Sequence, residues 1–324
     1  MSTLEMIEAA AERLRGHVRE TPILTSPFLD EIAGRRVLVK PECLQHTGSF
    51  KFRGAWSAIS ALSDAQRQRG MIAYSSGNHA QGVAYAAAQH GISSVIVMPS
   101  DAPQLKINNT RALGGEVVLY DRANESREEI GEALASQRSL TLIRPYDEPL
   151  VIAGQGTVGL ELARQTADLG IEKADVLVCC GGGGLTSGIA LALEGHAPGL
   201  RARPCEPQGF DDVKRSLATG YIQSNKAASG NICDAILTPQ PGQITFPILN
   251  RLCGPGLSVS EEDALRAMAQ AFLRLKIVLE PGGAVSLASA LFRAEKIEGD
   301  TVIVVASGGN ADPEVFGQAL EYLT

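Results

Sequence analysis

The sequence predicts an α/β protein with mainly parallel β-sheets. Seven short runs rich in β-branched residues are almost continuously apolar, which is typical of strands buried on both faces. They alternate with segments whose apolar residues recur three or four positions apart, as in a helix. Such alternation indicates parallel sheets. The strand runs are "RVLVK" (36–40), "MIAYS" (71–75), "SVIVMP" (94–99), "EVVLY" (116–120), "LTLIRP" (140–145), "DVLVCC" (175–180) and "TVIVVAS" (301–307), and the helical segments are 55–62, 80–90, 158–169, 261–275 and 284–296.

Length and composition predict a globular chain of two lobes. With 324 residues, of which 44% are hydrophobic and 20% charged, the chain can bury a large core. We place a small domain at 70–147, inserted in a large domain formed by 1–69 and 148–324. The formal net charge of -7 gives no basic footprint for nucleic acid. No apolar run approaches the roughly 20 residues that span a bilayer, so we expect neither a nucleic-acid nor a membrane partner.

The cysteines and the first twenty residues indicate the compartment. The six cysteines show neither CxxC spacing nor a disulfide framework, and therefore are expected to be reduced and mostly buried. Residues 1–20 mix acidic and basic side chains along an amphipathic pattern, which predicts a helix and not a signal peptide. We expect a cytoplasmic protein.

Four loops rich in glycine or asparagine follow strands, where open α/β sheets bind ligands. They are "TGSFKFRG" (47–54), "SSGNHAQG" (75–82), "CGGGGLTSG" (180–188) and "ASGGNADP" (306–313). A helix cap or a turn is enough to explain the second and the fourth loops. The four consecutive glycines at 181–184 instead leave backbone N–H groups bare at a helix start, which is a phosphate cradle.

The glycine loop matches neither common nucleotide motif. No Lys-Ser or Lys-Thr pair follows the glycines, and the third glycine of the dinucleotide fingerprint is missing. Glu206, about twenty residues further on, resembles the acid that binds ribose, so a nucleotide-binding protein remains an alternative. A single phosphate fits the loop better.

Lys51 lies among small and apolar residues, where an isolated ammonium is costly to bury. A lysine that forms a Schiff base with an aldehyde cofactor loses its charge. Pyridoxal phosphate supplies both an aldehyde and one phosphate. Lys51 and the glycine loop together therefore predict this cofactor.

The motifs resemble, in order and over nearly the whole chain, the fold type II pyridoxal-phosphate enzymes of the serine/threonine dehydratase and serine racemase group. They are "TGSFKFRGA", "SSGNHAQG", "VIAGQGTVGLE", "GGGGLTSGIA", "EPGGA" and "SGGN". The resemblance implies a tryptophan synthase β-like fold of two open, mainly parallel sheets flanked by helices, and we expect a homodimer. The chain ends one helix after "SGGN", so the regulatory domain of feedback-controlled threonine deaminases is not expected.

The resemblance implies a role for each motif residue. Lys51 would hold pyridoxal phosphate, Phe50 would pack on its ring, Asn78 would bond its 3-hydroxyl, Ser307 would meet its ring nitrogen, and the N–H groups of Gly181, Gly182, Gly183, Gly184 and Leu185 would hold its phosphate. The substrate carboxylate would bind the loop that contains Ser75, Ser76, Asn78 and His79. Ser76 would lie on the face of the cofactor opposite Lys51, where racemases return a proton.

The implied reaction is β-elimination from a hydroxy amino acid. A neutral serine at the ring nitrogen, Ser307, makes a weaker electron sink than an aspartate would allow, and this favours prompt loss of the β-hydroxyl. The expected activity is that of an ammonia-lyase acting on L-threonine or L-serine and giving a 2-oxo acid and ammonia. 3-Hydroxyaspartate ammonia-lyase remains an alternative, because Arg144 and Tyr146 leave the side-chain pocket open. Serine racemase remains another, because elimination and racemisation share nearly every residue and diverge only after the α-proton leaves.

A cation site is expected at "CEPQGFDD" (205–212). Glu206 and Asp212 are hard carboxylates around a turn, and with the carbonyl of Phe210 they suit Mg²⁺ or Ca²⁺. The plain alternative is that Asp211 or Asp212 caps the following helix. The resembling enzymes hold a divalent cation at this glutamate, carbonyl and aspartate, which favours the metal.

Overall fold

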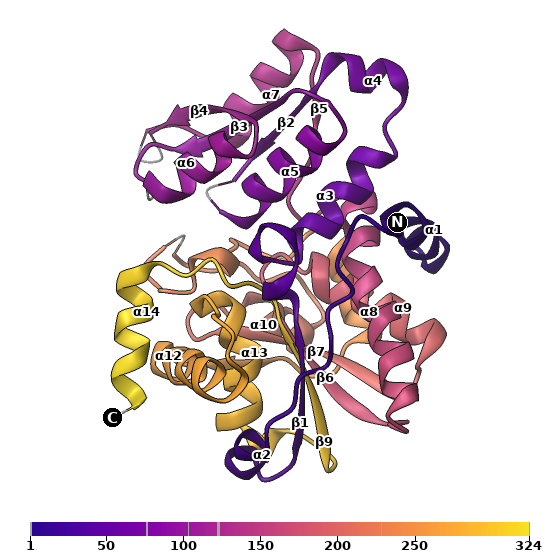
Figure 1. Ribbon diagram of the computed structural model, residues 1–324, viewed down its shortest axis with the longest axis vertical. Coiled ribbons are helices and arrows are strands. Elements are labelled where there is room, and N and C mark those ends of the chain that lie inside the picture. Colours follow the sequence, from indigo (N-terminus) through magenta and orange to yellow (C-terminus); the bar gives the residue numbers. More distant parts are fainter. Residues whose placement is uncertain (1, 76, 103, 122–123, 228, 324) are drawn as a thin grey trace.

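The structure, a computed structural model, describes residues 2–75, 77–102, 104–121, 124–227 and 229–323. In these ranges the strands form two parallel sheets, which confirms the α/β prediction. Figure 1 shows the four-stranded sheet above the five-stranded one. The larger sheet has the order β1 (Arg36–Pro41), β9 (Thr301–Ala306), β6 (Ala174–Cys179), β7 (Leu200–Pro207), β8 (Leu257–Val259), and the smaller has the order β4 (Gly115–Tyr120), β3 (Ser94–Pro99), β2 (Met71–Tyr74), β5 (Thr141–Leu142).

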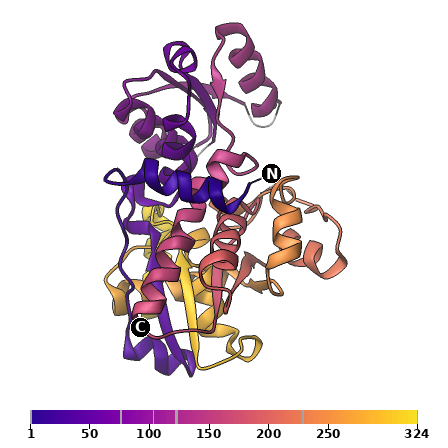
Figure 2. The same cartoon turned by 90° about the vertical axis from the view of Figure 1, so that its right-hand side faces the viewer.

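Helices cover both sheets (Figures 1 and 2). In the described ranges they are α1 (Leu4–Leu14), α2 (Pro27–Ala33), α3 (Lys51–Ser60), α4 (Asp64–Arg69), α5 (Asn78–Gln89), α6 (Gln104–Ala112), α7 (Arg127–Arg138), α8 (Pro149–Asp168), α9 (Gly184–His196), α10 (Asp212–Thr219), α11 (Thr245–Leu252), α12 (Glu261–Gln270), α13 (Pro281–Phe292) and α14 (Pro313–Leu320). Shorter helical turns include η1 (Glu42–Leu44), η2 (His46–Gly48), η3 (Asp234–Ile236) and the π-turn η4 (Ala271–Leu275).

The five-stranded sheet is buried on both faces because its strands are apolar at successive positions. In β9, Val302 and Val304 pack with α12 and α13, whereas Ile303 and Val305 pack with α8 and α9 on the other face. Successive side chains of a strand point to opposite faces, so one apolar run serves two cores. This is the physical basis of the strand prediction.

The four-stranded sheet is packed in the same way. Met71 and Ile96 contribute to a core shared with α3 and α5, and Ile72 and Val97 contribute to a core shared with α7. Each of the seven predicted runs overlaps a strand, and each of the five predicted helical segments overlaps a helix. Strands β7 and β8 were not predicted. The domain limits at 69/70 and 147/148 stay a prediction.

The structure bears on two expectations from the sequence, the state of the cysteines and the lack of a membrane-spanning helix. The six cysteines are free thiols, and five of them are buried. Within the described ranges, no helix has both the length and the apolar character needed to cross a membrane.

Candidate active site

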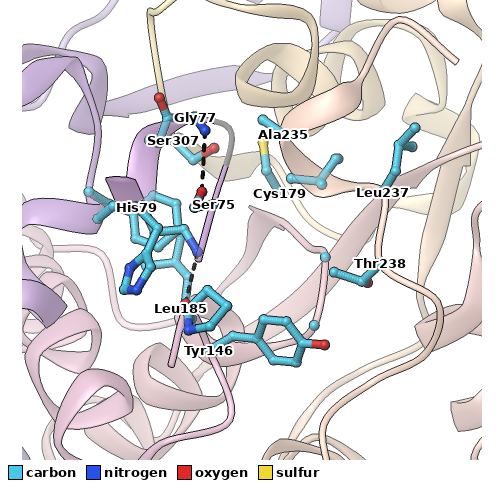
Figure 3. A pocket seen from close by; sticks show the side chains of 18 of the residues that line it. Ser75, Gly77, His79, Tyr146, Cys179, Leu185, Ala235, Leu237, Thr238 and Ser307 are labelled. Atoms are coloured by element: carbon cyan, nitrogen blue, oxygen red, sulfur yellow. Dashed lines mark hydrogen bonds between the residues drawn. The ribbon is translucent and has the colours of Figure 1, made fainter. Parts of the chain in front are cut away.

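A pocket lies between the two sheets, at the carboxyl ends of β2, β6 and β9. Ser75 follows β2, Cys179 ends β6 and Ser307 follows β9, and all three line the pocket. Ligands of open α/β sheets bind at such strand ends. Figure 3 shows Tyr146 and Thr238 facing the same space as Ser75 and Ser307.

The pocket brings together the predicted cofactor and substrate residues that the structure describes. Its lining includes Phe50, Lys51, Ser75, Asn78, His79, Gly181, Gly182, Gly183, Gly184, Leu185 and Ser307. Ser76 lies outside the described residues. Arg144 does not line this pocket, since its guanidinium reaches outward to within 3.7 Å of Glu132.

Lys51 begins helix α3 after a tight turn. Thr47 adopts the left-handed conformation with φ +60°, which is uncommon for a residue with a side chain and typical of constrained sites. The Lys51 amine donates to the carbonyl of Pro145 at 2.9 Å and lies 5.3 Å from the centre of the Phe50 ring. Burial lowers the pKa of Lys51 to about 8, with Glu280 acting in the opposite direction. The lowered pKa enlarges the neutral fraction of the amine, which suits a nucleophile and a base.

The glycine loop leads into helix α9. The carbonyl of Gly182 accepts a hydrogen bond from the Thr245 hydroxyl at 2.7 Å, and the first N–H groups of a helix have no intrahelical acceptor. A Cβ atom added to Gly182 would overlap the ring of Tyr146, so only glycine fits there. The N-terminus of α9 therefore presents bare donors and a partial positive charge to the pocket.

Three of the buried, unpartnered polar atoms that belong to pocket residues fit a phosphorylated cofactor. Gln155 Nε2, Thr186 Oγ1 and Thr238 Oγ1 are buried and have no hydrogen-bond partner in the described part of the chain. Buried polar groups are normally satisfied, so atoms of this kind indicate a missing ligand. Together with Lys51 and the α9 donors they suit a group with an aldehyde and one phosphate.

His79 lies at the start of helix α5. One of its ring nitrogens, Nε2, is 3.0 Å from the carbonyl of Ile143, which can only accept a hydrogen bond. Burial, reinforced by Lys51, lowers the pKa of His79 to about 3. The ring is therefore neutral, with its proton on Nε2, and does not serve as a cation for the substrate.

Several pocket residues were not predicted from the sequence. Arg127, Lys106, Asp234 and Glu280 line the pocket with Lys51. Glu280 belongs to the quoted "EPGGA" motif, but a glutamate before Pro281 is also what a helix start requires. Arg127 begins α7 within "SREE", which is indistinguishable from a solvated helix face.

At the candidate cation site, helix α10 is capped by Glu206 and not by an aspartate, as the plain alternative required. Neither Asp211 nor Asp212 caps α10, because the buried Glu206 carboxylate accepts from the N–H groups of Val213 (2.8 Å) and Lys214 (2.7 Å). Asp212 Oδ1 accepts from Asn225 at 2.6 Å. Asp212 Oδ2 is buried without a partner among the described residues.

The two carboxyl groups are held in an environment that disfavours their charge. Burial raises the pKa of Glu206, and the neighbouring Asp212 raises it further. Burial also raises the pKa of Asp212 to about 7. Glu206 does not line the pocket that contains the glycine loop, which removes the main support for a nucleotide-binding protein.

The fold and pocket define an enzyme of the α/β class with a lysine facing a one-phosphate cradle. The chain belongs to the pyridoxal-phosphate dependent enzymes, whose family model matches residues 14–308. It is 41% identical to an L-threo-3-hydroxyaspartate ammonia-lyase of Pseudomonas sp over 99% of both chains. It is 38% identical to a serine racemase of Schizosaccharomyces pombe, over 99% of this chain and 98% of that protein.

A solved structure gives the same assignment. The crystal structure of a threonine deaminase from the organism abbreviated "T.th." is 44% identical, with a TM-score of 0.90 over 96% of this chain and 99% of that chain. The protein is thus a pyridoxal-phosphate enzyme of the ammonia-lyase and racemase group.

Proposed function

We propose that the protein is an ammonia-lyase that eliminates the β-hydroxyl of a 3-hydroxy amino acid, with 3-hydroxyaspartate as its preferred substrate. One observation carries the substrate preference: Arg127 and Lys106 line the same pocket as Lys51. Serine and threonine have no second carboxylate for these cations. The similarity to the Pseudomonas ammonia-lyase supports the same choice.

Of the two cationic side chains, Arg127 is better suited to bind the second carboxylate of the substrate. Its Nε donates to the adjacent Glu128 at 2.7 Å, and the guanidinium carbon lies 5.6 Å from the centre of the Tyr74 ring. Planar guanidinium suits a carboxylate because it offers parallel N–H donors. Lys106 is also paired, at 3.2 Å from Asp234, and its ammonium lacks the planar pair of donors that a guanidinium offers. The expectation that L-threonine or L-serine comes first is therefore revised in favour of the dicarboxylic substrate.

The pocket residues fit pyridoxal phosphate in the roles that the resemblance implies. Lys51 would bind it covalently, Phe50 and Ser307 would contact its ring, Asn78 its 3-hydroxyl, and Gly181, Gly182, Gly183, Gly184 and Leu185 its phosphate. When bound, pyridoxal phosphate supplies an electron sink for the bonds of the substrate's α-carbon.

The protein's own groups would bind the substrate and move its proton. The N-terminus of α5, with Asn78 and His79, would hold the α-carboxylate, and Arg127 would hold the β-carboxylate. The Lys51 amine would remove the α-proton. The α-proton and the β-hydroxyl are lost as water, which leaves an enamine. Hydrolysis of the enamine gives the 2-oxo acid and ammonia.

Serine racemase is the second candidate, supported by the similarity to the Schizosaccharomyces pombe protein. Elimination and racemisation both begin with loss of the α-proton. They differ in whether a proton returns from the opposite face, the role that the resemblance gives to Ser76. Ser76→Ala should therefore reduce D-serine formation far more than ammonia release, and equal loss of both would contradict that role.

A substrate panel tests the proposal. Ammonia, 2-oxo acid and D-serine are measured with L-threo-3-hydroxyaspartate, L-serine and L-threonine, and kcat/KM is expected to be highest for hydroxyaspartate. Arg127→Met should lower that value about 10 to 100-fold, the effect of one charge-assisted hydrogen bond, and change the value for serine little. Arg138→Met, at the exposed far end of the same helix, is the matched control. Equal losses for both substrates, or faster turnover of serine by wild type, would overturn the preference.

We also propose a Mg²⁺ or Ca²⁺ site at Glu206, Asp212 and the Phe210 carbonyl. The unpartnered Asp212 Oδ2 supports it, since a buried carboxylate oxygen is a suitable ligand for either ion. The site is separate from the pocket, so the ion would stabilise the β7–α10 turn and take no part in chemistry. A homodimer stays a prediction.

A further inference from the structure

Three polar side chains form a hydrogen-bonded line at the edge of the pocket. Asn310 Nδ2 donates to the Thr47 carbonyl at 2.8 Å and to Asn78 Oδ1 at 2.7 Å. Asn78 Nδ2 in turn donates to Glu280 Oε1 at 2.5 Å. The line joins the loop before Lys51, the start of α5 and the start of α13.

The Thr47 carbonyl at one end determines which way the amides face. It only accepts hydrogen bonds, so Asn310 must present its nitrogen there; the same nitrogen donates to Asn78 Oδ1, which leaves the Asn78 nitrogen facing Glu280. The Asn78 nitrogen carries a second hydrogen, for which the described residues provide no hydrogen-bond acceptor. Because Asn78 lines the pocket, this hydrogen is available to a ligand there.

The Glu280 side chain contacts Asn78 and does not cap helix α13. It occupies the N-cap position of α13, yet its side chain caps no N–H group of that helix. The residue is only 3% exposed, and a Cβ atom added to Gly308 would overlap its carboxylate. The "EPGG" and "SGGN" loops are therefore shaped around a buried carboxyl group that borders the cofactor site.

Charged and titratable groups from several elements face Glu280. They are Lys51 on α3, Lys106 on α6, Asp234 on η3, Cys43 on η1 and Cys233 before η3. Burial raises the pKa of Glu280 to about 7, while the Asn78 hydrogen bond, Lys106 and Lys51 oppose that rise and Asp234 adds to it. The carboxyl group thus exchanges its proton near neutral pH.

We propose that Glu280 is a positioning residue that acts through Asn78. Its carboxylate holds the Asn78 amide with the nitrogen toward the pocket, where the amide donates to the ring hydroxyl of pyridoxal phosphate. The inference rests on the proposed contact between Asn78 and the cofactor. A carboxylate, as a charged acceptor, holds the amide more firmly than a neutral carboxylic acid does.

A double-mutant cycle on cofactor affinity tests the coupling. Pyridoxal phosphate is titrated into apoprotein of wild type, Glu280→Ala, Asn78→Ala and the double variant. Glu280→Ala should weaken binding about tenfold, the effect of about one hydrogen bond, in the wild-type background and not in the Asn78→Ala background. An unchanged affinity in Asn78→Ala would refute the Asn78 contact itself. Independent, multiplicative losses would refute only the action of Glu280 through Asn78.

A spectroscopic titration uses a milder variant that keeps the fold. Glu280→Gln retains an acceptor oxygen and nearly the same volume but cannot titrate. The absorbance of the bound cofactor in wild type should change with a midpoint at about pH 7, and Glu280→Gln should lack that change. Asp263→Asn, which removes a buried carboxylate from the α12 capping box, should titrate like wild type. A wild type without the transition, or a transition unchanged in Glu280→Gln, would overturn the proposal.

Discussion

Lys51 and Arg53 are two residues apart on helix α3, and their surroundings differ sharply. Arg53 is fully buried and pairs with Glu42 through Nε and Nη2, both at 2.8 Å, and with Glu161 at 2.6 Å. Lys51 has a carbonyl as its hydrogen-bond acceptor and no carboxylate within 4 Å among the described residues. Burial lowers the pKa of Lys51, whereas the two glutamates outweigh burial and raise that of Arg53.

The comparison of Arg53 with Lys51 distinguishes a buried charge that stabilises the fold from a buried amine that takes part in chemistry. A buried charge that is fully paired keeps its ionisation and holds elements together, as Arg53 does for η1, α3 and α8. A buried lysine without a carboxylate partner is poised to lose its proton and to react. The same helix can therefore anchor the fold with one side chain and carry chemistry with another.

Lys51→Ala should give the largest effect and act on chemistry alone. Turnover should fall at least about 1000-fold, because both covalent cofactor binding and the proton acceptor are lost. The melting temperature of the apoprotein should not fall at neutral pH, since no ion pair is broken and the unfavourable burial of the ammonium is removed. Steady-state kinetics and thermal unfolding measure the two quantities. A variant with wild-type turnover would sink the assignment of Lys51.

Arg53→Met should give the opposite result. Removing the guanidinium leaves Glu42 and Glu161 without their shared partner, which costs about 3–5 kcal/mol of the free energy of unfolding. Any loss of activity should follow the loss of folded protein. Denaturant unfolding tests this, and a stability equal to that of Lys51→Ala would erase the contrast between the two residues.

Removing divalent cations should have a smaller effect, confined to stability. A ligand at a hundredfold excess over its Kd stabilises the folded state by about 2.7 kcal/mol. Chelation should lower the melting temperature, Mg²⁺ or Ca²⁺ should restore it, and Glu206→Ala should abolish the response while the absorbance of the bound cofactor persists. Identical melting of wild type with and without chelator would show that no ion binds there.

The last effect expected is a pH dependence of apoprotein stability, confined to pH values above neutral. The pKa of Lys51 is about 8 in the folded protein and 10.5 in an unperturbed chain. The unfolded state binds more protons between these values, so stability should rise with pH across that window. Lys51→Met should lack this contribution. Parallel stability curves for the two proteins would contradict the lowered pKa.

Most strands could be predicted from the sequence because an apolar run is a local signal. Strand β7 was missed because Arg201, Arg203 and Pro204 interrupt its pattern. Both arginines pair with Asp175 on the neighbouring strand β6, at 2.9 and 2.7 Å. That neutralisation depends on a contact far away in the sequence. Strand β8 has only three residues, too few to show a period.

The candidate site was predictable to a different degree for each residue type. Lys51 and the four glycines are unusual in their local context, which is why they could be recognised. Glu280 and Arg127 have ordinary local roles at helix starts, and only the packing of α7 and α13 around one pocket gives them a role in the site. The cap of α10 by Glu206 was likewise hidden, because the two are six residues apart.

The most direct test of the central claim is to find which lysine carries the cofactor. Purified holoprotein is reduced with borohydride, digested and analysed by peptide mass spectrometry. A stable phosphopyridoxyl group is expected on Lys51 and on no other lysine. Modification of Lys40 or Lys106 in its place, or no modification of any lysine in a protein that retains activity, would contradict it.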